Sequence, residues 1–297
     1  MSKNGLPRKP LTKRRLKNLI LNVLKNPFNM VVLVSLIILF CLIIIPLLTM
    51  ISSTFTLAQG ELRRVQGHVG DFTLYYWKYI LTGKLASAVL WGPLKNSFIC
   101  GFFTVLVSVP LGSVLAWLMI RTDLPGKKIL GLLVTVPYMI PSWTKALAWL
   151  AMFRNSTSGA NGFLAGLGIP VPDWLAYGPI AIVLCMSMHY YAFSYIMVSG
   201  ALRSINSELE EMGEIQGASK AQILRHITLP LILPSVLSAT VMTISKSIGT
   251  YGVPANLGNR IGYYTLATKM RNFIDQGPQA VGYSMSIVLV LLAAVII

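Results

Sequence analysis

Long apolar runs separated by short polar segments dominate this sequence. The first run extends from Met30 to Ile51, and further runs cover about 93–120, 129–152, 179–202 and 231–250, with a sixth starting near Ala280. Each completed run reaches the roughly 20 residues that an α-helix needs to cross a bilayer. The pattern predicts an all-α integral membrane protein with about six transmembrane helices. Two prolines in the third run, Pro137 and Pro141, predict a broken helix there.

The segment before the first run has a different, amphipathic pattern. Between residues 12 and 25 the apolar positions share one helical face, namely Leu16, Leu19, Ile20, Val23 and Leu24. This arrangement predicts an amphipathic helix lying in the membrane interface. A secretory signal is the alternative, but the run that follows is too long for one and no A-x-A cleavage pattern comes after it. We therefore expect residues 1–28 to form a basic tail with an amphipathic helix, and residues 29–297 to form the transmembrane domain.

Composition supports a membrane protein and orients it. Hydrophobic residues make up 55% of the chain and charged residues 11%, whereas a soluble domain carries roughly 25% charged residues. The net charge of +16 does not point to nucleic acid, because many of the basic residues precede the first apolar run: Lys3, Arg8, Lys9, Lys13, Arg14, Arg15, Lys17 and Lys25. Such a cluster is typical of a cytoplasmic N-terminus, which makes the loop between the fourth and fifth runs cytoplasmic as well.

The sequence shows no catalytic or metal-binding pattern. It lacks the G-x-x-x-x-G-K-[ST] loop that would bind ATP and the G-x-S-x-G motif of a nucleophilic serine. Its three histidines are scattered without metal-ligand spacing. The cysteines, Cys41, Cys100 and Cys185, all lie inside apolar runs, so we expect small buried residues without a disulfide framework. If the chain moved a solute uphill across the membrane, the energy would have to come from a partner.

A polar island at 207–230 separates the fourth and fifth apolar runs. Ser207 and Glu210 fit a capping box, which predicts a short helix from residue 208 onward. Gly217 follows where a helix end favours a positive φ angle. Ser219 and Gln222 form a second box, which predicts a second short helix before the next apolar run. The segment therefore predicts a helix, a glycine elbow and a second helix at the membrane surface.

The same segment resembles a cytoplasmic loop found in permease subunits of binding-protein-dependent ABC importers. Those permeases carry the pattern E-A-A-x3-G-x9-I-x-L-P, and this chain has Glu211-Met212-Gly213, then Gly217, then Ile227-Thr228-Leu229-Pro230 at that spacing. Met212 and Gly213 replace the two alanines. The alternative is a solvated loop with ordinary helix caps. Within a coupling loop at 203–230, the resemblance implies that the ATPase-coupling residues are Glu211, Gly217, Ala218, Ile227, Leu229 and Pro230.

Three further stretches are similar to the permeases of iron(III) and 2-aminoethylphosphonate importers. They are R-T-D-L-P-G at 121–126, Tyr-Gly-Val-Pro at 251–254 and Tyr-Thr-Leu-Ala-Thr at 264–268. Thr250 departs from that subgroup, which often has an acidic residue there, so a cation-handling role at this position is in doubt. Many members of the subgroup are fused pairs, and an end inside the last apolar run would suit one half of such a pair.

The resemblance implies a prokaryotic inner-membrane protein that imports a small solute, such as iron(III), a phosphonate or a similar anion. Its implied partners are an ABC ATPase dimer that binds ATP and magnesium, a second permease half (homologous, fused or identical) and an extracytoplasmic solute-binding protein. No cofactor is implied in this chain, and no enzymatic activity. The alternative is an ATP-independent secondary transporter or channel, which predicts internal repeats or discontinuous helix pairs and no docking hairpin.

Three ionisable residues lie inside apolar runs: Lys145, His189 and Lys246. Such residues are costly in lipid and usually face a bundle interior or a wet path. Straight helices would place both lysines roughly 22–24 Å from the cytoplasmic ends of their runs, as a positive collar that favours an anion. The alternatives are lysines that snorkel to the headgroups and a packed, hydrogen-bonded histidine. We add Tyr251, at the start of the Tyr-Gly-Val-Pro stretch, to these candidate substrate-path residues.

Overall fold

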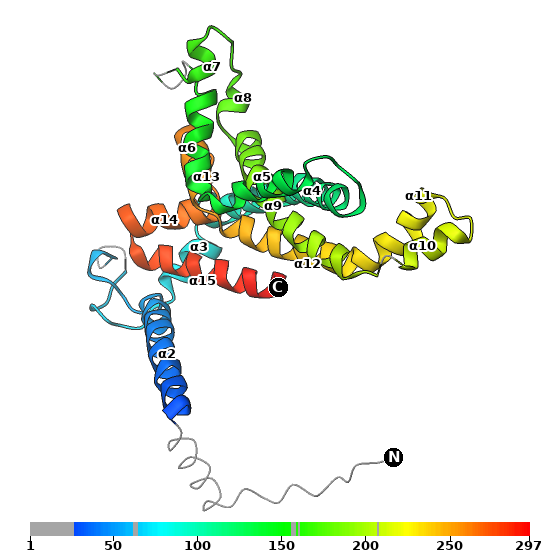
Figure 1. The fold of residues 1–297 in the computed structure, drawn as a ribbon. Coiled ribbons are helices and arrows are strands. Elements are labelled where there is room, and N and C mark those ends of the chain that lie inside the picture. Colours follow the sequence, from blue (N-terminus) through cyan, green and yellow to red (C-terminus); the bar gives the residue numbers. More distant parts are fainter. Residues whose placement is uncertain (1–26, 62–64, 156–158, 160, 207) are drawn as a thin grey trace, which may run out of the picture. The chain divides into compact units, whose positions relative to one another are not determined.

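The computed structural model describes residues 27–61, 65–155, 159, 161–206 and 208–297, which divide between two compact units, 1–53 and 54–297. Apart from one isolated bridge between Thr56 and Phe72, these described residues contain no strand. The helices in chain order (Figure 1) are α2 (Pro27–Ser53), η1 (Gln59–Glu61), α3 (Tyr75–Leu81), η2 (Ser87–Trp91), α4 (Gly92–Arg121), α5 (Lys127–Met139), α6 (Ser142–Phe153), α7 (Phe163–Gly166), α8 (Asp173–Ala176), α9 (Pro179–Ser204), α10 (Glu208–Ile215), α11 (Lys220–Ile223), η4 (Leu224–Thr228), α12 (Leu229–Gly249), α13 (Gly252–Leu257), η5 (Asn259–Ile261), α14 (Leu266–Gln276) and α15 (Gln279–Ile296).

The described part of the first unit is the single helix α2. It contains the first predicted apolar run, and none of its residues is buried within the chain. An apolar helix without protein packing around it is what a lipid environment accommodates. Cys41 is consequently exposed, contrary to the expectation of a buried cysteine. The amphipathic helix predicted for 12–25 lies outside the described residues.

Five helical segments of the described chain are long and apolar enough to cross a membrane. They are Pro27–Ser53, Ser87–Arg121, Pro179–Ser204, Lys220–Gly249 and Gln279–Ile296. These segments contain the first, second, fourth, fifth and sixth predicted runs. The prediction of an all-α membrane protein is confirmed.

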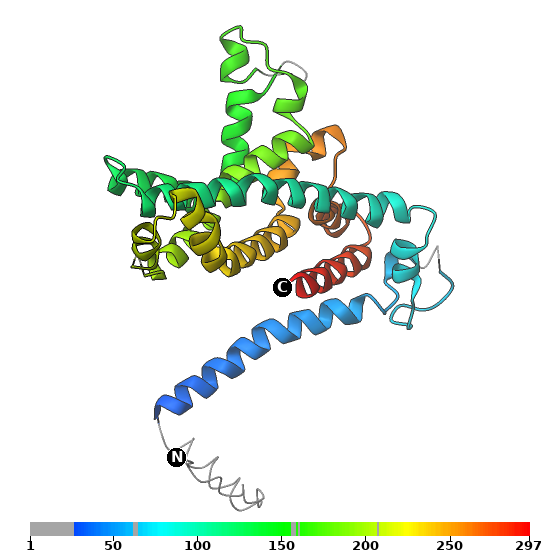
Figure 2. The ribbon, with the colours of Figure 1, turned by 90° about the vertical axis from the view of Figure 1, so that its right-hand side faces the viewer.

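The third predicted run, 129–152, is two shorter helices rather than one continuous span. Helix α5 ends at Met139 and α6 begins at Ser142, with Ile140 extended (φ −79°, ψ 129°) between them. Pro141 explains the break, because it lacks an N–H and disfavours helical geometry at the residue before it. Pro137, by contrast, lies inside α5. Figure 2 shows α6 rising at a steep angle to α4, with α7 and α8 beyond it.

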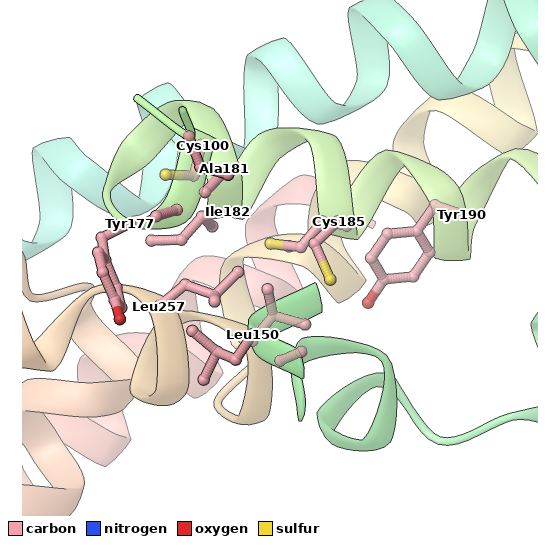
Figure 3. Close-up of a cluster of buried hydrophobic side chains, with 13 residues drawn as sticks. Cys100, Leu150, Tyr177, Ala181, Ile182, Cys185, Tyr190 and Leu257 are labelled. Carbon is pink, nitrogen blue, oxygen red and sulfur yellow. The ribbon is translucent and has the colours of Figure 1, made fainter. Parts of the chain in front are cut away.

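Helices α4 and α9 lie side by side and form the centre of the second unit, with α12 against both. Gly112 permits the close approach: a Cβ there would lie 2.4 Å from the carbonyl oxygen of Tyr191. A buried cluster joins α4 and α9 to α6 and α13 through Cys100, Ile182, Leu150 and Leu257 (Figure 3). This core fixes the positions of α6 and α9, and the packing of α12 against α4 and α9 fixes α12. These three helices carry the three ionisable residues noted in the sequence.

Candidate functional site

The predicted elbow is present between α10 and α11. Gly217 has φ +84°, a backbone conformation that a side chain penalises. The N–H of Gly217 donates to the carbonyl of Glu214 (2.9 Å), and that of Ala218 donates to the carbonyl of Gly213 (3.0 Å). These two bonds make a Schellman motif, which satisfies the last carbonyls of the first helix. The positive φ predicted for Gly217 is confirmed.

The second arm of the hairpin begins where its capping box predicts. The backbone N–H of Ser219 donates to Gln222 Oε1 at 2.8 Å, and the Ser219 hydroxyl oxygen accepts from the Gln222 N–H at 3.4 Å. Helix α11 then starts at Lys220. The first box cannot be compared in the same way, because Ser207 lies outside the described residues. The first helix does begin at Glu208, as expected.

The second arm does not end before the next membrane run. Helix α11, the π-helical turn η4 and α12 follow one another without a gap, so one helical segment extends from Lys220 to Gly249. Pro230 lies in the first turn of α12. A proline removes one helical hydrogen bond and crowds the carbonyl four residues earlier, and the wider π turn just before it relieves that conflict. The hairpin is therefore rigidly continuous with the fifth membrane run.

Packing between the two arms explains one departure from the family pattern. A Cβ on Gly213 would lie 3.2 Å from side-chain carbons of both Ile223 and Ile227. These two isoleucines of the second arm fill the space that an alanine side chain would need. The glycine in place of the second alanine thus lets the arms close around Ile223, which is buried.

The outer surface of the first arm is apolar and uncovered in the chain. Leu209, Met212 and Ile215 recur every three residues along α10 and are 47%, 56% and 85% exposed. Glu211, Leu229 and Pro230 are also exposed, while Ala218 and Ile227 are half-buried. Residues three apart share one helical face. The hairpin therefore offers an apolar surface with an adjacent carboxylate, which is the form a partner groove can bind.

Replacing Gly217 with alanine isolates the role of its backbone. No heavy atom lies within 4 Å of the position its Cβ would take, so φ +84° is the source of strain. We expect a cost of about 1 kcal/mol in hairpin stability, and reduced copurification of a docked partner at unchanged expression. Gly200→Ala is the matched control, because its Cβ also meets nothing and its φ is not positive. Equal behaviour of the two variants would contradict the role of the elbow.

The three ionisable residues from the apolar runs gather in one place. Lys145 Nζ on α6 contacts His189 Nδ1 on α9. The His189 ring stacks on Tyr138 of α5, with centroids 5.4 Å apart. Lys246 Nζ on α12 donates to the Tyr138 hydroxyl at 3.3 Å and lies 4.3 Å from the centroid of the Phe193 ring. Four helices thus meet at one mixed aromatic and basic cluster, although α6 is not the straight continuation of α5 that the depth estimate assumed.

The net charge of this cluster follows from the hydrogen bonds and ring contacts of its members. A lysine ammonium has only donors, so when Lys145 is charged, Nδ1 of His189 is the acceptor in this contact and the ring is neutral. Among the described residues, neither Lys145 nor Lys246 forms an ion pair with a carboxylate. Aromatic faces partly compensate the ammonium of Lys246. The cluster therefore keeps a net positive charge that an anion could neutralise.

An open cavity of about 620 Å³ adjoins the cluster. Lys145 is its one charged lining residue, and the other walls are apolar or aromatic: Pro137, Ile140, Ala148, Trp149, Met152, Phe153, Cys185, Met188 and Tyr191. Tyr251, the fourth candidate, is 45% exposed just beyond α12. Its neighbour Thr250 exchanges a 2.8 Å hydrogen bond with the hydroxyl of Tyr190, which gives that position a structural partner without an acidic group.

A family model described as "Binding-protein-dependent transport system inner membrane component" matches residues 108–297. The chain belongs to this family. The match extends from the middle of α4 through the hairpin to α15 and covers more than half of the chain. It confirms the predicted class, a permease subunit of a binding-protein-dependent ABC importer, which is a transporter component of the inner membrane and not an enzyme.

Individual relatives of the permease are distant. A probable sulfate transport system permease protein cysT of Marchantia polymorpha is 27% identical over 180 residues, which are 59% of each chain. A putative 2-aminoethylphosphonate transport system permease protein PhnV of Salmonella typhimurium is 28% identical over 219 residues, or 74% of this chain and 75% of that one. A solved bacterial ABC transporter involved in import of the acidic polysaccharide alginate has a chain with the same fold, with a TM-score of 0.69 at 19% identity, covering 94% and 95% of the two chains.

Two members of the permease's basic cluster were missed in the sequence. Tyr138 joins His189 to Lys246, and Phe193 lies beneath the Lys246 ammonium. Both are aromatic residues inside apolar runs, where aromatic side chains are ordinary. The usable signal was the spacing between His189 and Phe193, which places them one helical turn apart on α9.

Proposed function

We propose that this permease imports a small oxyanion or phosphonate, which it receives from a solute-binding protein and releases into the cytoplasm. A separate ABC ATPase dimer, carrying ATP and magnesium, docks on the hairpin between α10 and α11 and supplies the energy. A second permease half completes the path. The N-terminus and the hairpin face the cytoplasm in this arrangement, as the basic N-terminal cluster indicates.

The observation that carries the choice of an anion is the uncompensated basic cluster. Lys145 and Lys246 belong to one contact chain through His189 and Tyr138. Rings of basic groups favour anions and oppose bare cations. The names of the relatives agree, since they refer to sulfate and 2-aminoethylphosphonate. Iron(III) has weaker support, because a bare cation would meet the two ammonium groups and an acidic residue is missing at Thr250.

The hairpin is the element through which the ATPase would move the transport path. Its exposed apolar residues Leu209, Met212 and Ile215 fit a partner groove. Because α11, η4 and α12 are one continuous helical segment, a displacement of the docked hairpin is passed to α12, which carries Lys246. Closure of the ATPase dimer would in this way rock α12 against the other helices, and the basic cluster would change its access from one side to the other.

Uptake by Lys246→Gln tests the anion path. The substitution keeps length and polarity but removes one charge, so we expect uptake of labelled sulfate or 2-aminoethylphosphonate to fall by about tenfold or more, while complex assembly and basal ATP hydrolysis persist. Lys84→Gln is the control, because Lys84 is exposed and lies outside the cluster. Unchanged uptake of both probes in Lys246→Gln and in the double variant with Lys145→Gln would overturn the anion proposal.

A further inference from the structure

One ion pair joins the end of α4 to the hairpin. Arg121 Nε lies 3.1 Å from Glu210 Oε2, and the two side chains are only 15% and 20% exposed. The other carboxylate oxygen, Oε1, accepts a 2.7 Å hydrogen bond from the hydroxyl of Thr228, which is buried. A single carboxylate on the first arm therefore holds both the α4 terminus and η4 of the second arm.

The charge of Arg121 is compensated by the Glu210 carboxylate. Nη2 of Arg121 is buried and finds no hydrogen-bond partner among the described residues, and Nε is close to Glu210 without the alignment of a hydrogen bond. The guanidinium charge is therefore compensated electrostatically by Glu210. Removing one partner of a sheltered pair leaves the other charge uncompensated, which is far more costly than losing an exposed pair.

The opposite end of α4 is also held by hydrogen bonds distant in sequence. The side-chain amide of Asn96 donates to the carbonyl of Tyr264 at 2.9 Å. The backbone N–H of Leu266 donates to the hydroxyl of Ser97 at 2.8 Å, and this serine is 2% exposed. The start of α4 is thus fixed to Tyr264 and to the first residue of α14.

Between its two ends α4 packs closely against α9 and α12. Its 30 residues span about 45 Å at 1.5 Å per residue. Glycines at two levels bring it against its neighbours: a Cβ on Gly101 would lie 3.0 Å from Ser247 Oγ of α12, and one on Gly112 would lie 2.4 Å from the Tyr191 carbonyl of α9. Pro110, inside α4, removes one helical hydrogen bond, and the close contacts at Gly101 and Gly112, on either side of it, limit bending at that point.

We propose that α4 acts as a rigid connection, or strut, between the α10–α11 hairpin and segment 264–268 at the opposite end of α4. A displacement of the hairpin would move α4 and, through it, that segment. Arg121 is the positioning residue that fixes α4 to the hairpin. The proposal rests on the proposed function, since it requires an ATPase docked at the hairpin. The proposal also gives a role to two sequence stretches outside the coupling loop. R-T-D-L-P-G at 121–126 begins with the arginine of the ion pair. Tyr-Thr-Leu-Ala-Thr at 264–268 contains Tyr264 and Leu266, the two residues that bond to the start of α4.

The strut predicts uncoupling rather than loss of assembly when the pair is broken. The test uses the complete complex in liposomes and compares wild type with Arg121→Gln and Glu210→Gln. We expect the ATPase to copurify and basal hydrolysis to persist in both variants. Stimulation of hydrolysis by the loaded cognate binding protein, and uptake of labelled sulfate or 2-aminoethylphosphonate, should fall by about tenfold. Lys128→Gln is the control and should behave as wild type, because Lys128 is exposed and lies outside the hairpin, at the start of α5.

Two further variants separate transmission from simple folding. The charge swap Arg121→Glu with Glu210→Arg should recover a substantial part of the stimulation that either reversal alone removes, since the pair interacts through charge. Ser97→Ala, at the far end of α4, should reproduce the loss of stimulation without touching the hairpin. Full stimulation in Arg121→Gln, or loss of stimulation in Arg121→Gln alone with a normal Ser97→Ala complex, would overturn the strut. A wild-type complex that binds no ATPase would instead overturn the proposed function.

Discussion

Gly112→Ala should be among the most damaging single substitutions in the chain. Its Cβ would lie 2.4 Å from the Tyr191 carbonyl oxygen, 2.7 Å from Ser194 Cβ and 2.8 Å from the Tyr195 nitrogen. Two of these atoms belong to the backbone of α9, so no side-chain rotation relieves the clash. The two central helices must separate, at a cost of about 1–3 kcal/mol or more. We expect a clear fall in the thermal unfolding midpoint of the purified protein and reduced insertion yield.

Gly200→Ala provides the comparison for this expectation. Gly200 lies in the same α9, and a Cβ there would meet no atom within 4 Å. In a helix, alanine is intrinsically favoured over glycine by roughly 1 kcal/mol, so this variant should be as stable as wild type or more so. A Gly112→Ala protein with an unchanged unfolding midpoint would show that α4 and α9 do not pack as closely as the structure indicates.

Features encoded within a few residues were predictable from the sequence. The elbow at Gly217, the capping box of Ser219 with Gln222 and the helix start at Glu208 follow from local backbone and hydrogen-bonding rules. Apolar runs located the long helices because a bilayer demands continuous hydrophobic length. Proline predicted the break in the third run, although only the structure identifies Pro141 rather than Pro137 as its position.

The side-chain contacts that join distant segments were not predictable, even where the meeting of those segments was expected. Glu210 fits a capping box in the sequence, yet its carboxylate contacts Arg121 and Thr228 on other elements. The gathering of Lys145 with Lys246 was expected from straight helices at equal depth. The structure instead brings them near one another through Tyr138 and His189, around a helix break. Helix crossing angles decide such contacts, and periodicity in a single sequence does not encode them.

Met212→Asp should nearly abolish binding of the ATPase to the hairpin. Met212 is 56% exposed at the centre of the apolar surface between Leu209 and Ile215. An aspartate there would lose its hydration inside the partner's apolar groove. We expect this to cost the binding free energy about 2 kcal/mol, or roughly 30-fold in affinity. Copurification of the ATPase with the detergent-solubilised permease measures this effect directly.

Two control variants, Met212→Leu and Glu214→Gln, test whether the loss of ATPase binding comes from the charge placed in the apolar surface. Leucine keeps the apolar surface and should preserve ATPase binding, because volume-conserving apolar exchanges are well tolerated. Glu214→Gln removes an exposed charge from the same helix while leaving the apolar surface intact, so it should have a small effect. If Met212→Asp retained the ATPase as well as Met212→Leu does, the partner would contact another face of the hairpin. Glu211, the exposed carboxylate beside Met212, would then be the position from which to map that face.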